Sequence, residues 1–288
     1  MPAYKDKFYN SADLELKLHY RDYDGPHERP PILCLPGLTR NARDFEPVAE
    51  RFAGEWRVIC PSFRGRGLSA RDPKPERYEP AVYAADTLKL LDQLGIADAV
   101  FVGTSLGGIV TMLMSSTDGE RIAGALLNDI APEIAEAGLE RIRTYVGKQP
   151  IFESYADAGA ALGQSMGTIY PDWGAAEWER FARRLMKEVK GGVQHDYDPR
   201  IADNFNKVME EPRNHAWHLL GGLTEVPVTI LRGGASDLFT AEVATRMAGE
   251  LPNAELVTID NVGHAPSFDE AGSIAALERL LARVLDAQ

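Results

Sequence analysis

Cysteine is scarce in this sequence, with only Cys34 and Cys60 among 288 residues. Two cysteines do not provide a disulfide framework or a four-ligand zinc site. Both lie in short apolar runs, so we expect two small buried side chains. No apolar stretch approaches the ~20 residues needed to span a bilayer. The first residues also lack the apolar core of a secretory signal, and we therefore expect a cytoplasmic protein.

Positive charge is scarce as well, because 31 Lys and Arg face 43 Asp and Glu, for a net charge of −12. Phosphate backbones and anionic lipid repel such a chain, which argues against nucleic acid or a membrane surface as a partner. There is no His/Cys cluster with metal-ligand spacing and no phosphate-binding glycine loop with its lysine. We expect no metal and no organic cofactor. The composition does not indicate an oligomeric state.

Short apolar runs alternate with stretches of helical spacing. The runs are nearly continuous, which is typical of strands buried on both faces of a parallel sheet, and they cover residues 31–35, 57–60, 99–102, 123–127, 226–231 and 254–259. Before them, residues 14–20 alternate apolar and polar side chains, as in a half-buried antiparallel strand. Apolar residues at three- and four-residue spacing mark residues 45–52, 81–94, 108–115, 240–251 and 273–285. This order predicts an α/β fold with right-handed crossovers.

The alternation stops over residues 132–223, a length far beyond an ordinary connection. Helical periodicity appears at residues 139–146, 155–166 and 178–189, and no buried strand is evident. We predict a helical cap over residues 132–223, inserted into a core made of residues 1–131 and 224–288. The alternative is a further set of helices that pack on the core.

The sequence Gly103-Thr104-Ser105-Leu106-Gly107 has the pattern G-x-S-x-G. It follows a predicted buried strand and opens a predicted helix, which is the order that a nucleophile elbow needs. The two glycines leave room for a strained turn that exposes Ser105. The helix directs its positive end at the site, and the Leu106 N–H is then a candidate oxyanion donor.

A serine nucleophile needs a base and an acid to orient that base. His264 follows the last predicted buried strand, at the sheet edge where ligands bind in open α/β sheets, so we expect it to be the base. Two aspartates also follow predicted strands, Asp237 and Asp129, and the chain order Ser–Asp–His fits both. The residues alone leave both open as the acid.

A second oxyanion donor is expected from the loop after an early strand. The sequence Leu35-Pro36-Gly37-Leu38 follows the run at residues 31–35. The glycine lets the backbone turn an amide inward, so the Leu38 N–H is the candidate donor.

These pieces together resemble the α/β-hydrolase superfamily, particularly its small capped bacterial esterase and lactonase-like members. The resemblance runs nearly end to end and includes Leu35–Leu38, Arg64–Ser69, Gly103–Gly108, Gly233–Asp237 and Gly263–His264. It implies a mostly parallel, eight-stranded sheet flanked by helices. In this family the acid usually follows the strand after the cap, which favours Asp237 over Asp129. The family's turn at Arg64–Ser69 is structural, and Ser105 argues against the branches that use an aspartate nucleophile.

The resemblance implies a serine hydrolase that acts on small carboxylic esters. The same triad could instead cleave a lactone or a carbon–carbon bond, since a fold alone does not fix a reaction. A ligand-binding receptor with slow or no turnover is the alternative from another class.

Substrate choice is expected to depend on the cap. Apolar side chains there could line a pocket or simply pack the cap on the core; they are Ile151, Phe152, Tyr155, Met166, Tyr170, Trp173 and Trp178. Arg40 follows the predicted oxyanion loop, and a contact with a substrate carboxylate is one hypothesis for its role. A surface arginine is the other.

Overall fold

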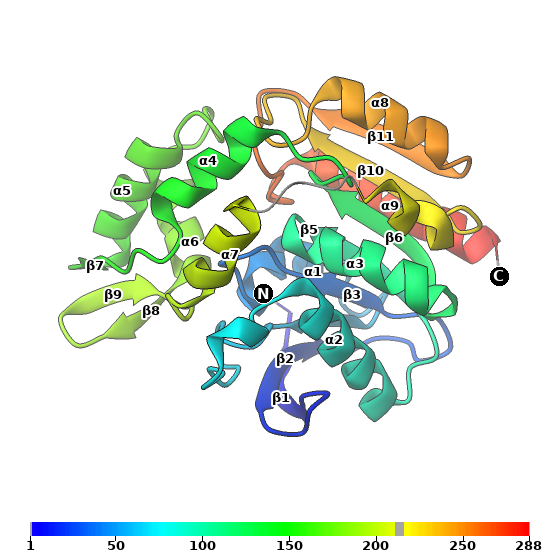
Figure 1. The fold of residues 1–288 in the computed structure, drawn as a ribbon, viewed down its shortest axis with the longest axis horizontal. Coiled ribbons are helices and arrows are strands. Elements are labelled where there is room, and N and C mark those ends of the chain that lie inside the picture. Colours follow the sequence, from blue (N-terminus) through cyan, green and yellow to red (C-terminus); the bar gives the residue numbers. More distant parts are fainter. Residues whose placement is uncertain (1, 211–215, 288) are drawn as a thin grey trace.

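An eight-stranded sheet organises the chain in the computed structural model, which describes residues 2–210 and 216–287 (Figure 1). The strand order is β1-β2-β4-β3-β5-β6-β10-β11. The pairs β1–β2 and β2–β4 are antiparallel, and the other neighbours are parallel. The predicted fold, a mostly parallel sheet flanked by helices, is confirmed.

The eight strands of the sheet are β1 (Tyr4–Asn10), β2 (Lys17–Tyr23), β3 (Ile32–Leu35), β4 (Val58–Pro61), β5 (Ala99–Thr104), β6 (Ile122–Asn128), β10 (Val228–Gly233) and β11 (Ala254–Ile259). The strands that the sequence predicts lie mostly within two or three residues of these bounds. Strand β1 was missed because its side chains are mostly exposed at the sheet edge, so it carries no apolar pattern.

Helices cover both faces of the sheet. On one face lie α1 (Glu46–Phe52) and α9 (Ala271–Asp286), and on the other lie α2 (Pro80–Leu94), α3 (Leu106–Thr117) and α8 (Ala241–Glu250). Alternate residues of one strand therefore enter different cores, as Leu33 and Cys34 of β3 do. Cys34 and Cys60 are both buried free cysteines, as expected.

The segment between β6 and β10 lies beside the sheet in Figure 1. Its helices are α4 (Glu136–Tyr145), α5 (Tyr155–Met166), α6 (Ala175–Leu185) and α7 (Ile201–Glu210), followed by the 3₁₀ helix η4 (Trp217–Leu223). Residues 211–215 of the predicted cap lie outside the described residues.

The segment predicted as a helical cap also contains strands that the sequence did not indicate. A small antiparallel sheet is present, with the order β7-β9-β8, formed by β7 (Ile151–Phe152), β8 (Met186–Val189) and β9 (Gly192–His195). These strands are two to four residues long and only Met186 and Val193 in them are buried, so they give no run of buried side chains. The helix predicted at 178–189 accordingly ends at Leu185 and continues as β8.

Buried polar contacts fix this segment to the core. The guanidinium of Arg184 on α6 contacts the carboxylate of Asp269, and the Tyr78 hydroxyl donates to Asp198 at 2.7 Å. Among residues 2–210 and 216–287, no helix is both long and apolar enough to cross a membrane.

Candidate functional site

Ser105 lies in the tight turn between β5 and α3, with φ of 52° and ψ of −113°. A non-glycine residue rarely adopts positive φ, so the surroundings must hold this strained conformation. Glycines make the turn possible: a Cβ at Gly103 would lie 2.6 Å from the Gly107 carbonyl oxygen, and one at Gly107 would overlap the Leu35 carbonyl. The serine is thereby placed at the N-terminus of α3, where the helix dipole favours negative charge.

His264 reaches Ser105 from the loop after β11. Its Nε2 lies 3.0 Å from the Ser105 Oγ. Three hydrogen bonds hold this loop: the Asn128 side chain donates to the Pro266 carbonyl at 2.8 Å, the Tyr170 hydroxyl donates to Ala265 at 2.7 Å, and the Gly263 N–H donates to Ile169 at 2.8 Å. Both the sheet and the segment between β6 and β10 therefore position the imidazole.

Asp129 is the carboxylate that contacts His264. It follows β6 directly, is fully buried, and its Oδ2 lies 2.7 Å from the His264 Nδ1. The same oxygen accepts from the Ser236 hydroxyl at 2.6 Å, and Oδ1 accepts from the Gly233 N–H at 2.7 Å. A buried carboxylate with this many donors is well solvated by the protein in its ionised form.

Asp237, the acid that the resemblance favours, makes no hydrogen bond to His264 among the described residues. Its carboxylate pairs with Arg141 on α4, with the Arg141 Nη2 donating to Oδ1 at 2.8 Å. That hydrogen bond lowers the pKa of Asp237, and its side chain is 35% exposed. The turn after β10 places Ser236 on Asp129 and directs the next residue away toward α4. Ser236 and Gly233 are supporting partners that the sequence reading missed.

The loop after β3 brings Leu38 to the site. Within the described part of the chain, the N–H groups of Leu38 and Leu106 donate to no acceptor. The Gly37 carbonyl accepts from the Arg40 N–H at 3.1 Å. Since carbonyl and N–H point in opposite directions across a trans peptide, the Leu38 N–H is directed away from that turn. Both candidate donors are thus available to a ligand atom.

Arg66 supports the loop after β3 through hydrogen bonds. Its side chain is fully buried, and its Nε donates to the Leu38 carbonyl at 2.9 Å while Nη1 donates to the Tyr83 hydroxyl at 2.8 Å. The role that the resemblance implies for the Arg64–Ser69 turn, structural rather than chemical, agrees with these contacts.

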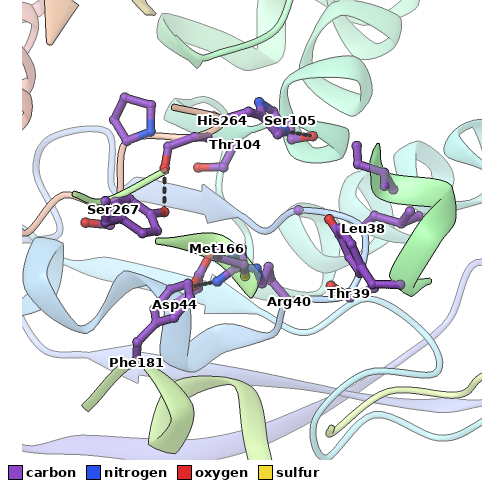
Figure 2. A pocket seen from close by; sticks show the side chains of 16 residues that line it. Leu38, Thr39, Arg40, Asp44, Thr104, Ser105, Met166, Phe181, His264 and Ser267 are labelled. Atoms are coloured by element: carbon purple, nitrogen blue, oxygen red, sulfur yellow. Dashed lines mark hydrogen bonds and ion pairs between the residues drawn. The ribbon is translucent and has the colours of Figure 1, made fainter. Parts of the chain in front are cut away.

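A cavity opens beside Ser105 and is shown in Figure 2. Its lining comes from the loop after β3, the elbow, the His264 loop and the segment above the sheet. Of the apolar side chains expected to line a pocket, Met166 and Tyr170 line this cavity, and Ile142, Tyr145 and Phe181 join them. Trp173 and Trp178 pack around Tyr170 and line a separate hollow away from Ser105, and Ile151 is exposed.

The described residues hold no group of three or more His, Cys, Asp or Glu side chains arranged for a metal ion. The polar groups around the cavity instead form a relay of hydroxyl, imidazole and carboxylate beside two open backbone N–H groups. Such a relay can remove the proton of a serine and stabilise an oxyanion, which are the requirements of acyl transfer.

Comparison with known proteins identifies the family of the chain. The sequence model of the Alpha/beta hydrolase family matches residues 32–277. A crystal structure of an alpha/beta hydrolase from Novosphingobium aromaticivorans is 48% identical, with a TM-score of 0.93, and the match covers 98% of this chain and 99% of that one.

Two relatives are similar over most of their length. A 3-hydroxybutyrate-oligomer hydrolase from Cupriavidus necator is 30% identical over 267 residues, which is 90% of each chain. A 2-(acetamidomethylene)succinate hydrolase from Mesorhizobium japonicum is 27% identical over 240 residues, covering 82% of this chain and 81% of the relative.

Proposed function

The chain belongs to the alpha/beta hydrolase family, and from that premise we propose that it hydrolyses carboxylic esters through an acyl-enzyme on Ser105. One observation carries the proposal: the hydroxyl of Ser105, the imidazole of His264 and the carboxylate of Asp129 are joined in sequence at 3.0 and 2.7 Å. Acylation of a serine needs these three groups in this order.

In the first half-reaction, His264 removes the proton of Ser105 as its Oγ attacks the ester carbonyl. Asp129 holds the imidazole with Nδ1 protonated and stabilises the imidazolium that forms. The N–H groups of Leu38 and Leu106 stabilise the tetrahedral oxyanion. His264 then donates its proton to the leaving alcohol, and the acyl group stays on Ser105.

In the second half-reaction, a water molecule replaces the alcohol. His264 removes a proton from it as the water oxygen attacks the acyl carbon, and the same N–H groups stabilise the second oxyanion. Collapse of this intermediate returns the proton to Ser105 and releases the carboxylic acid. Every proton moves between substrate, water, Ser105 and His264, so the cycle closes without another reactant.

The substrate is proposed to be a small molecule. Side chains from several elements enclose the cavity and about half of them are apolar, which suits a short acyl or alcohol chain. The relative that hydrolyses 3-hydroxybutyrate oligomers supports esters of hydroxy acids as a substrate class.

A fluorophosphonate is expected to label Ser105 and to abolish hydrolysis of p-nitrophenyl acetate and butyrate in proportion to labelling. The activated hydroxyl attacks phosphorus as it would attack a carbonyl carbon, and the adduct cannot be hydrolysed quickly. The measurement combines p-nitrophenol release with mass spectrometry of the peptide that contains Ser105.

Turnover that persists after complete labelling would exclude Ser105 as the nucleophile. Labelling without any ester turnover would contradict the ester assignment and favour a lactone, a carbon–carbon bond or a receptor role. Protein inactivated by heat serves as the control, because it retains the serine but loses the relay.

A further inference from the structure

A charged pair lies in the cavity away from Ser105. Arg40 and Asp44 both line it, and their side chains meet at 3.1 Å, from Nη1 to Oδ1. Figure 2 shows Ser105 and His264 at one end of this view and the pair beside Phe181 at the other. The relay described above does not use either side chain.

The guanidinium of Arg40 has donors to spare. An arginine carries five N–H donors in a rigid fork, and Asp44 takes one of them. The other side-chain donors of Arg40 have no acceptor among residues 2–210 and 216–287, and none of them is sealed from solvent. The edge formed by Nε and Nη2 is therefore available, and its geometry matches the two oxygens of a carboxylate.

The surroundings of Arg40 strengthen such a contact. Its side chain is only 17% exposed, and its guanidinium carbon lies 4.5 Å from the centre of the Phe181 ring. The ring limits the positions open to the guanidinium, and the limited solvent makes a hydrogen bond to an anion stronger than at the surface.

The positive charge of Arg40 acts on His195 as well as on Asp44. The pKa of His195 is lowered to about 4, first by burial and then by the positive charge of Arg40. His195 is consequently neutral at pH 7, and Arg40 is the arginine whose guanidinium lines the cavity. In a chain of net charge −12, a local cation of this kind is what an anionic substrate would need in order to bind.

The first carbons of the Arg40 side chain lie close to Ser105, on the same side of Gly37. A Cβ at Gly37 would lie 3.4 Å from the Arg40 Cγ and 3.8 Å from the Ser105 Cβ. The Gly37 carbonyl accepts from the Arg40 N–H, so one turn carries both the Leu38 N–H and the guanidinium. A ligand held by that guanidinium would be oriented relative to the oxyanion donors.

We propose that Arg40 binds a free carboxylate on the ester substrate, a few bonds from the carbonyl that Ser105 attacks. This inference rests on the proposed function and narrows it to esters that carry an acid, such as an acylated hydroxy acid. Arg40 is then a specificity-determining residue, and Asp44 orients its side chain. The bond that breaks and the proton transfers stay as described above.

Arg40→Gln is expected to lower kcat/KM for 3-acetoxybutanoate by about 10- to 100-fold, as loss of a charged hydrogen-bonded contact would. The neutral isostere 3-acetoxybutanamide, which has the same single ester, is expected to lose far less. Monoethyl glutarate and its neutral monoamide form a second pair, with the carboxylate on the acyl side. The pair that shows the larger selectivity loss identifies the side of the ester that Arg40 contacts.

Two further variants sharpen this comparison. Asp44→Asn removes the competing negative charge and is expected to raise the preference for the carboxylate several-fold. Arg183→Gln removes a positive charge from α6 outside the cavity, where the side chain is 57% exposed, and is expected to leave the preference unchanged. Equal losses on charged and neutral esters in Arg40→Gln would overturn the proposal.

Binding measured by calorimetry separates this inference from the proposed function. Ser105→Ala protein is expected to bind 3-acetoxybutanoate, and Arg40→Gln in that background is expected to weaken the affinity at least about tenfold. Arg40-dependent binding without wild-type turnover would reject ester hydrolysis and keep the carboxylate site. Ester turnover by the wild type, together with an affinity that is unchanged in the Arg40→Gln variant, would reject the carboxylate site and keep ester hydrolysis.

Discussion

Asp129→Asn is expected to lower kcat for ester hydrolysis on the order of 10⁴-fold, the size of effect known for the same change in a Ser-His-Asp triad. The present carboxylate accepts from the Gly233 N–H, the Ser236 hydroxyl and the His264 Nδ1. An asparagine has one acceptor oxygen, so its amide group must face a donor. We expect His264 to change tautomer and present an N–H to Ser105, which removes the base.

Asp237→Asn is the matched control, because the resemblance to the family favoured this residue for the same role. Its carboxylate pairs with Arg141 at the edge of the site, and the two side chains are 35% and 26% exposed. Partly exposed pairs contribute little, and among the described residues no hydrogen bond joins Asp237 to the imidazole, although the charge of His264 helps to lower the pKa of Asp237. We expect kcat to change less than about threefold, consistent with loss of a peripheral ion pair.

Steady-state rates with p-nitrophenyl acetate, measured over pH 6 to 9, test both variants. Circular dichroism must show that each variant is folded, and a fluorophosphonate must still reach Ser105. A large loss in Asp237→Asn together with near-normal Asp129→Asn would reject Asp129 as the acid. Comparable losses in both would indicate that the two carboxylates act on the imidazole together.

The sequence identifies Ser105 and His264 because local features determine where they lie. Ser105 lies between two glycines in a tight strand-to-helix turn, a pattern typical of a nucleophile elbow. The structure places Ser105 in this turn with φ of 52°. His264 follows the last strand, and the carboxyl ends of parallel strands meet at one edge. Each placement needs only the order of elements along the chain.

The acid could not be chosen in this way, because two aspartates satisfy the same rule. The strands β6 and β10 are neighbours, so Asp129 and Asp237 both emerge at the same edge of the sheet. The choice depends on the turn from Gly233 to Ser236 and on the partner that Arg141 offers from a distant segment. Those are tertiary contacts, and no periodicity encodes them.

The cavity lining is unpredictable for a related reason. Helical spacing shows that one face of α4 or α6 is apolar, but not whether that face meets the core or the cavity. Ile142 and Phe181 line the cavity, whereas Trp178 packs within the segment above the sheet. The short strands β8 and β9 are likewise stabilised by pairing with each other rather than by a buried run of their own.

Arg64→Met is expected to destabilise the fold by about 3–5 kcal/mol, the usual result of removing one partner from a buried ion pair. The guanidinium of Arg64 is fully buried and contacts Asp72 at 2.6 Å and Asp86 at 2.8 Å, both also buried. Methionine fills much of the volume but leaves two carboxylates without their cation. Burial already raises the pKa of Asp86 even with Arg64 in place.

The sign of the pH dependence follows from that burial. An acid whose pKa is higher in the folded state than in the unfolded state costs stability when it is ionised, so the cost grows as pH rises through the folded-state pKa. Removing Arg64 is expected to raise the pKa of Asp86 further. Arg64→Met should therefore lose most stability at neutral and alkaline pH and recover part of it in mild acid.

Thermal and urea unfolding of wild type and Arg64→Met, at pH 5 and pH 8, measure this effect. Arg51→Met is the control, because its pair with Glu278 is exposed at 42% and 41% and should matter little. Adding Asp72→Asn and Asp86→Asn to Arg64→Met removes the uncompensated charges and is expected to restore part of the loss. An Arg64→Met protein as stable as wild type at pH 8 would show that the ion pairs of Arg64 with Asp72 and Asp86 do not stabilise the fold.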